Sequence, residues 1–253
     1  MIAGGSTSRA SRRSRSWGDR AAMAHLLYPA RKVPEPSRAD PTSKQVRLDA
    51  IGAQVLTCRR CALHSTRTLG VPGVGPATAR LMAIGEAPGE REDKEGKPFV
   101  GAAGRLLTEL LEGVGLSRQD IFITNVIKSR PPGNRDPLPD EVMACAGYLD
   151  AQIAVIQPEV ILLLGRHALQ RLLPGAPGIS QCHGQVMRSA DRTYMPCYHP
   201  AAALYQGSLM PALRTDFEKL RVHLDSQSQA PSRAEGALNA SGDSTQAEQL
   251  GLF

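Results

Sequence analysis

Side chains that can do chemistry gather in a few polar loops, each next to a short apolar run. One stretch holds Glu86 and Glu92, the next begins with Asn125, and the last begins at His199. Carboxylates and imidazoles transfer protons or stabilise developing charge, and a carboxamide offers both a donor and an acceptor to a ligand. These loops therefore predict a catalytic or binding site built from polar side chains.

The glycine-rich stretch 85–101 does not match the nucleotide-binding motifs. It lacks the Gly-Lys-Ser/Thr ending of a P-loop, and its glycines are not spaced as in the dinucleotide fingerprint. Gly73 and Gly75 come before the apolar run at 81–85, on the wrong side for a dinucleotide turn. The motifs thus argue against a nucleotide cradle.

The chain has five cysteines, and two of them, Cys58 and Cys61, form a Cys-x-x-Cys pair. An odd count with such a pair is unlike a secreted disulfide framework, so we expect a reducing, cytosolic compartment. Taken alone, the pair indicates a redox site or half of a zinc site equally well.

The elements that position these loops follow from the hydrophobic pattern. We expect strands near 81–85, 121–127, 160–165, 185–188 and 193–197, and helices near 101–115, 139–156, 166–173 and 210–224. Such alternation predicts an α/β fold: a three-layer α/β/α domain around a short, mostly parallel sheet. In these folds the chemistry gathers at the carboxyl ends of the strands, where the polar loops lie.

The two ends of the chain have a different composition. Of 30 Lys and Arg and 24 Asp and Glu in 253 residues, residues 1–47 hold ten basic and three acidic ones. Residues 1–47 and 226–253 are polar and without apolar periodicity over most of their length, so we expect disordered arms around a domain at 48–225. The basic arm is interpretable as a leader preceding a true start at Met23, as a phosphate-attracting arm, or as a transit peptide. No apolar run reaches the roughly 18 residues of a membrane span, which argues against a membrane partner.

Four stretches resemble the motifs of the family 4 uracil-DNA glycosylases, the iron–sulfur branch of the uracil-DNA glycosylase superfamily. They are GEAPGERED (85–93), GKPFVGAAG (96–104), TNVIKSRPPGNRDPLPDE (124–141) and HPAA (199–202), in the family's order. The resemblance covers about residues 50–225. It implies a uracil-DNA glycosylase-like fold and a monofunctional hydrolase that cleaves the N-glycosidic bond of uracil in DNA, leaves an abasic site and serves base excision repair.

Base recognition in such an enzyme requires a tight pocket for an extruded base. Asn125 matches O4 and N3–H of uracil and opposes the amino group of cytosine; its alternative role is to cap a strand end. Phe99, expected to be exposed beside glycines, is a candidate to stack on the base, and the alternative is an ordinary core Phe.

Bond cleavage requires stabilisation of the negative charge that develops on uracil O2, and His199 in the HPAA stretch is the candidate donor. The resemblance implies that Glu86, Ala87 and Glu92 line the uracil site, and which of the two acids handles water stays open. Other families of the superfamily carry an aspartate where this chain has Ala87, so that general base is absent here.

The remaining assignments concern DNA, metal and partners. Arg130 and Arg135 suit phosphate contacts, and Leu204 is a candidate wedge for the vacated base position. The resemblance implies a 4Fe–4S cluster that clips the N-terminal segment onto the domain. Three of its ligand positions match Cys58, Cys61 and Cys145, whereas the fourth is Ser129; a labile or absent cluster is the alternative.

The chain ends in QLGLF, which resembles the pentapeptide that binds the bacterial sliding clamp. Gln249, Leu250, Leu252 and Phe253 would enter an apolar pocket, and the alternative is a chance apolar terminus. We therefore expect a monomer in the bacterial cytoplasm that acts on uracil in single- and double-stranded DNA. The rival hypotheses are a glycosylase for another damaged base and a non-catalytic iron–sulfur DNA-binding protein.

Overall fold

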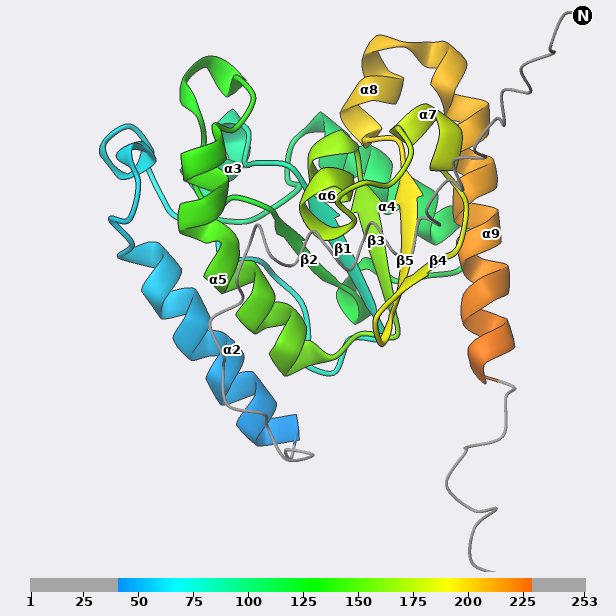
Figure 1. The fold of residues 1–253 in the computed structure, drawn as a ribbon, viewed down its shortest axis with the longest axis horizontal. Coiled ribbons are helices and arrows are strands. Elements are labelled where there is room, and N and C mark those ends of the chain that lie inside the picture. Colours follow the sequence, from blue (N-terminus) through cyan, green and yellow to red (C-terminus); the bar gives the residue numbers. More distant parts are fainter. Residues whose placement is uncertain (1–40, 229–253) are drawn as a thin grey trace, which may run out of the picture.

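The computed structural model describes residues 41–228, and its apolar runs form one five-stranded sheet (Figure 1). The strands are β1 (Leu81–Gly85), β2 (Phe122–Asn125), β3 (Val160–Leu164), β4 (Met187–Ser189) and β5 (Arg192–Cys197). Their order is β2-β1-β3-β5-β4, and every pair is parallel except the one made by the edge strand β4. The mostly parallel sheet predicted from the sequence is confirmed.

Helices cover both faces of this sheet. They are α2 (Pro41–Leu56), α3 (Glu90–Glu95), α4 (Ala102–Gly113), α5 (Pro139–Ile156), α6 (Arg166–Leu172), α7 (Ile179–Cys182), α8 (Pro200–Tyr205) and α9 (Met210–Ser228). Residues of α5 and α6 pack on one face, and residues of α4 and α9 pack on the other, so the fold has three layers (Figure 1). None of the helices within residues 41–228 is long and apolar enough to cross a membrane.

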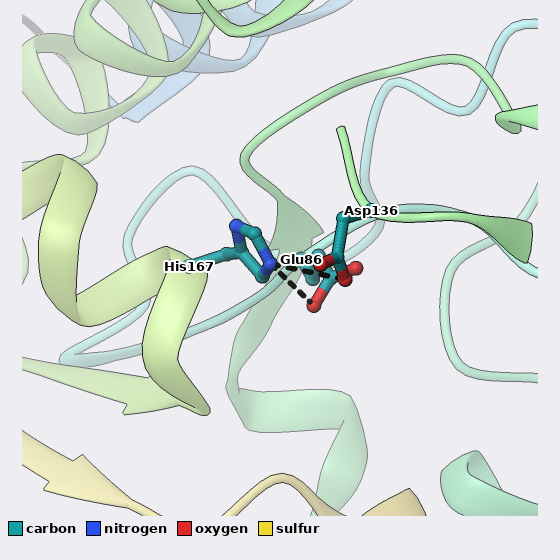
Figure 2. A group of neighbouring side chains, drawn as sticks. All are labelled: Glu86, Asp136 and His167. Atoms are coloured by element: carbon teal, nitrogen blue, oxygen red, sulfur yellow. Dashed lines mark ion pairs between the residues drawn. The ribbon is translucent and has the colours of Figure 1, made fainter. Parts of the chain in front are cut away.

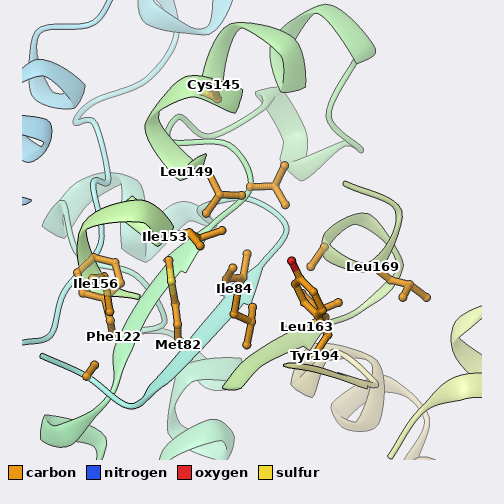
Figure 3. Close-up of a cluster of buried hydrophobic side chains, with 14 of the residues drawn as sticks. Met82, Ile84, Phe122, Cys145, Leu149, Ile153, Ile156, Leu163, Leu169 and Tyr194 are labelled. Atoms are coloured by element: carbon orange, nitrogen blue, oxygen red, sulfur yellow. The ribbon is translucent and has the colours of Figure 1, made fainter. Parts of the chain in front are cut away.

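Alternate residues of β1 belong to two separate cores. Met82 and Ile84 pack with Leu149 of α5, as Figure 3 shows, whereas Leu81 and Ala83 pack with residues of α4 and α9. A parallel strand covered on both faces must be apolar at every position, which explains the continuous apolar run.

Both predicted domain boundaries differ from the observed ends of the helices. Helix α2 begins at Pro41, ahead of residue 48, and α9 continues to Ser228, beyond residue 225. The first turns of α2 have little apolar periodicity, but Leu48 and Val55 of this helix are buried, and Leu48 belongs to the core of the α5 face. Tertiary packing therefore supports a helix that the local sequence does not indicate. The remaining parts of both predicted arms lie outside the described residues.

Candidate active site

A cavity of about 330 Å³ lies where β1, β2 and β5 end. It is lined by Glu86, Ala87, Pro88, Gly89, Glu92, Phe99, Ala103, Asn125, Pro131, Asn134, Arg135, His199, Ala201 and Tyr205. All six residues assigned from the sequence to uracil binding are among them. Two residues assigned to DNA contacts, Arg130 and Leu204, are not part of this lining.

Asn125 ends β2 with its side chain almost fully buried, at 2 % exposure. Its Oδ1 has no hydrogen-bond partner within the described residues 41–228. A Cβ atom at Gly85 would lie 2.5 Å from this Oδ1 and 2.6 Å from Cζ of Phe99, so only glycine allows both side chains to approach this closely. A buried carboxamide oxygen without a partner destabilises the fold until a donor binds it, which is the property of a recognition group.

Phe99 is buried, at 6 % exposure, and not exposed as the sequence suggested. Its backbone has a φ of 54°, and its ring stacks on that of His199 with the centroids 5.6 Å apart. A Cβ atom at Gly104 would lie 1.8 Å from the carbonyl oxygen of Phe99, so the tight turn requires glycine there. The turn directs the ring inward, where it forms part of both the cavity wall and the core of the α4 face.

Glu92, on α3, fixes this turn from the other side. Its Oε1 accepts hydrogen bonds from the backbone N–H groups of Val100 and Gly101, each at 2.8 Å. Arg118 holds the same turn by donating to the carbonyl oxygens of Pro98 (3.0 Å) and Gly104 (3.3 Å). One carboxylate oxygen of Glu92 is therefore committed to the loop.

His199 precedes α8 and caps it. Its Nδ1 accepts the backbone N–H of Ala201 at 3.1 Å, which leaves the ring proton on Nε2. Burial lowers the pKa of His199 to about 4, because desolvation disfavours the charged ring, although Glu92 acts weakly in the opposite direction. Near neutral pH the residue is thus a neutral imidazole that offers a single N–H donor.

Glu86 follows β1 directly and lines the cavity with a side chain that is 31 % exposed. Burial raises its pKa, and Nε2 of His167 lies 3.5 Å from its Oε2. Unlike Glu92, this carboxylate faces another side chain and not a row of backbone amides. It is the acidic group of the cavity that is placed to accept a proton.

The basic residues of the loop after β2 already have protein partners. Arg130 Nε donates to Asn134 Oδ1 at 2.8 Å, and Arg135 forms a bidentate ion pair with the buried carboxylate of Glu141 at 2.6 and 2.9 Å. This pairing lowers the pKa of Glu141. Arg135 therefore shapes the rim of the cavity while its side chain stays 39 % exposed.

Tyr205, the last residue of α8, was missed by the sequence reasoning. Its side chain is 94 % exposed and lines the cavity, whereas Leu204 is 49 % exposed. An exposed aromatic side chain at the mouth of a pocket is typical of a surface that contacts bases. In the sequence, Tyr205 closely follows the HPAA stretch, and this position could have indicated that it lies at the site.

Lys128 was also missed, and it supports the end of β2 from inside the domain. Its side chain is fully buried, and its Nζ donates to Thr124 Oγ1 (2.6 Å), Asn125 O (2.8 Å) and Gln152 Oε1 (2.8 Å). Burial lowers its pKa to about 7. The amine therefore anchors the backbone of Asn125 at the cavity.

A second site lies at a corner formed by the segment after α2, the loop after β2, and α5. Cys58 and Cys61 are half-buried in the first segment, Cys145 is buried on α5, and Ser129 is buried in the loop. Burial raises the pKa of the Cys145 thiol, with smaller contributions from neighbouring Cys61 and Cys58, while the backbone N–H of Lys128 donates to its Sγ at 3.4 Å. The three thiols assigned from the sequence thus share one corner.

Comparison with known proteins agrees with this architecture. The family model described as the uracil DNA glycosylase superfamily matches residues 72–221. A type-4 uracil-DNA glycosylase of Saccharolobus solfataricus is 46 % identical over 206 residues, which cover 78 % of this chain and 94 % of the relative. The chain belongs to the type-4 uracil-DNA glycosylases.

Two further relatives are type-4 enzymes from other organisms. A type-4 enzyme of Archaeoglobus fulgidus is 46 % identical over 181 residues, covering 68 % of this chain and 91 % of the relative. One of Thermotoga maritima is 41 % identical over 178 residues, covering 69 % and 93 %. The recognition of the family from four short motifs is confirmed.

Ser129, at the fourth expected ligand position, differs in its chemistry from the three cysteines at the same corner. Ser129 Oγ accepts a hydrogen bond from Arg67 Nη1 at 2.8 Å, and Arg67 Nη2 also donates to the carbonyl oxygen of Cys58 at 2.9 Å. Three thiols fit the ligand set of an iron–sulfur cluster, whereas a hydroxyl bound by a guanidinium is a harder and weaker donor. The corner fits such a cluster through three residues, with the fourth position changed.

Proposed function

We propose that this chain excises uracil from DNA by hydrolysing its N-glycosidic bond, which leaves an abasic site. The observation that carries the proposal is the unpartnered, buried Oδ1 of Asn125 in a cavity shared with His199 and Phe99. A carboxamide in this position accepts N3–H and donates to O4 of an extruded uracil, whereas it meets the amino group of cytosine with a donor.

The contacts of each polar group indicate its role in the proposed reaction. The Nε2–H of His199 donates to uracil O2 as negative charge develops there, which stabilises the transition state by about 3–4 kcal/mol. Glu92 holds the Phe99 turn, so Glu86 is the group that receives a proton from the attacking water. Ala87 carries no carboxylate, and Glu86, one residue earlier, takes the acidic role in this cavity.

The test uses oligonucleotides with a single uracil, cytosine or hypoxanthine, single-stranded and paired, incubated with anaerobically purified protein and then opened with alkali. Strand cleavage only at uracil supports the proposal. Cleavage at hypoxanthine but not at uracil supports the rival glycosylase. Binding of uracil-containing DNA without cleavage supports the non-catalytic binding protein.

We also propose that Cys58, Cys61 and Cys145 hold a 4Fe–4S cluster, with Ser129 at the fourth ligand position. Such a cluster would cross-link the segment after α2 to α5 and to the loop after β2, and it supplies no redox turnover to glycosidic hydrolysis. The backbone N–H of Lys128 that donates to Cys145 Sγ suits a thiolate ligand.

Ser129→Cys is expected to lengthen the lifetime of the cluster in air several-fold, because a thiolate binds iron more tightly than a hydroxyl. The measurements are iron content and the decay of visible absorbance, with Cys182→Ala, a buried cysteine of α7, as the control. Equal decay of the wild-type protein and the Ser129→Cys variant would remove residue 129 from the ligand set. Absence of iron from both would remove the cluster.

The terminal QLGLF lies outside the described residues, and we propose that it binds a bacterial sliding clamp. Deletion of residues 249–253 is expected to abolish clamp binding, because the apolar side chains of the motif are lost, and to leave excision from short oligonucleotides unchanged. Clamp binding is measured by surface plasmon resonance, with Asn239→Ala in the same tail as the control. Retained binding after the deletion would dismiss the motif.

A further inference from the structure

Two titratable side chains lie next to Glu86 and have no role in the chemistry described above. His167 lies on α6, and Asp136 lies in the loop before α5. His167 Nε2 is 3.5 Å from Glu86 Oε2 and 3.3 Å from Asp136 Oδ1, and Figure 2 shows the imidazole facing both carboxylates. Three segments distant in the sequence thus meet at one carboxylate of the base cavity.

His167 is largely buried, and its Nε2 lies within 4 Å of an oxygen of each carboxylate. Its side chain is only 14 % exposed, and its Nε2 is buried without a hydrogen-bond partner among residues 41–228. The carboxylates of Glu86 and Asp136 face this nitrogen at 3.5 and 3.3 Å. Because Glu86 lines the cavity, His167 contacts an acid at the site of the proposed chemistry.

The same three groups have the donor types of a metal site, but a neighbouring cation argues against that interpretation. Their ligand atoms lie within 4.8 Å of one another. However, Arg166 forms an ion pair with Oδ2 of Asp136, so a guanidinium already neutralises one of the two acids. A divalent cation would have to approach this positive charge, which is unfavourable at such short range.

We propose that His167 acts on the reaction as a positioning residue that holds Glu86 as an ionised carboxylate able to receive a proton from water, and that Asp136, paired with Arg166, opposes this effect through its own negative charge. The inference rests on the proposed function, because it assigns regulation of the group that handles water there. His167 contacts one carboxylate oxygen, and the rest of the carboxylate remains available to the cavity.

The charges around Glu86 act in opposite directions. After burial, which raises its pKa, His167 lowers the pKa of Glu86, Asp136 raises it, and Arg166 lowers it. The other charged or titratable groups that line the same cavity are Glu92 of α3, Arg135 of the loop after β2, His199 before α8, and Tyr205 of α8. Replacement of His167 or of Asp136 should therefore change the pH at which activity falls on the acid side. The direction of this shift should depend on which of the two residues is replaced.

The experiment measures single-turnover uracil excision from pH 5 to 8 for the wild-type protein, His167→Gln and Asp136→Asn. A general base works only when ionised, so His167→Gln should raise the pKa of Glu86 and move the acid limb to higher pH. Asp136→Asn should move it to lower pH. At pH 5 we expect rates about two- to five-fold below and above the wild-type rate, respectively, the size of a partly exposed ion pair.

Two further variants keep this result interpretable. Asp225→Asn breaks an Arg–carboxylate pair on α9 outside the cavity and should leave the limb unchanged. Arg166→Gln alters a side chain that is 56 % exposed, so folding should tolerate it, and the limb should move to higher pH as for His167→Gln. Shifts of equal sign in His167→Gln and Asp136→Asn, or no shift beyond that of Asp225→Asn, would overturn the inference.

Glu86→Gln separates this inference from the function on which it rests. Loss of excision in Glu86→Gln, together with opposite limb shifts in the other two variants, supports the inference. Full activity in Glu86→Gln would overturn the inference and leave the glycosylase proposal intact. A wild-type protein without uracil excision would overturn both.

Discussion

Replacement of His199 by alanine is expected to slow uracil excision by about 10²–10³-fold, while the affinity for DNA changes little. The neutral ring offers one N–H at Nε2, and its contribution grows as charge develops on uracil O2. A group that acts mainly in the transition state changes the rate constant of excision more than it changes binding. The measurement combines single-turnover rates with fluorescence anisotropy on an abasic-site oligonucleotide.

The shift in the pKa of His199 adds a pH signature to this prediction. Because burial lowers the pKa to about 4, the ring stays neutral over the whole range above pH 5, so the wild-type profile should contain no limb from His199 there. His223→Ala, on α9 outside the cavity, serves as the control for loss of a histidine. Excision by His199→Ala within about threefold of the wild-type rate would contradict its assignment, since one well-placed donor is worth more.

Asn125→Asp is expected to lower the preference for uracil over cytosine by about ten- to a hundredfold. An ionised Asp has no donor for uracil O4, and its oxygens accept from the exocyclic amino group of cytosine. The substitution preserves shape, and the backbone carbonyl of residue 125 remains a partner of Lys128 Nζ, so the position of the side chain should be kept. The ratio of excision rates on matched uracil and cytosine oligonucleotides measures the change.

Asn134→Asp is the matched control for this specificity change. Asn134 also lines the cavity, but it is exposed at the rim and bonded to Arg130. The same chemical change there should leave base preference unaltered, because a solvated carboxylate imposes little selection on the base. An unchanged uracil preference in Asn125→Asp would remove Asn125 from base reading.

Local signals in the sequence were sufficient to predict most elements of the domain. The run at 81–85 ends at Gly85 as predicted, and α5 begins at Pro139 and ends at Ile156 as predicted. In both cases the boundary coincides with a residue that restricts or frees the backbone, so the information is local. The start of α2 was not predictable, because that helix depends on burial of Leu48 against the rest of the domain.

The residue types of the cavity were likewise determined by the sequence, since uracil chemistry requires a carboxamide, an acid and a donor at strand ends. The roles of the two acids were not. Glu86 and Glu92 look alike in the motif, and only the backbone amides of Val100 and Gly101 commit Glu92 to the loop. Which acid remains free depends on the path of a turn, a property that no spacing of residues encodes.

Several other features were decided by the tertiary structure alone. Phe99 sits in a polar, glycine-rich stretch, yet the turn over Gly104 buries its ring against His199. His167 and Asp136 come from separate segments of the sequence. They become neighbours of Glu86 only because α6 and the loop before α5 meet there in the folded chain. The sequence by itself determined the family, the sheet and the chemical groups, because these follow from local patterns. The distances between those groups arise from long-range packing, and only the folded chain decides them.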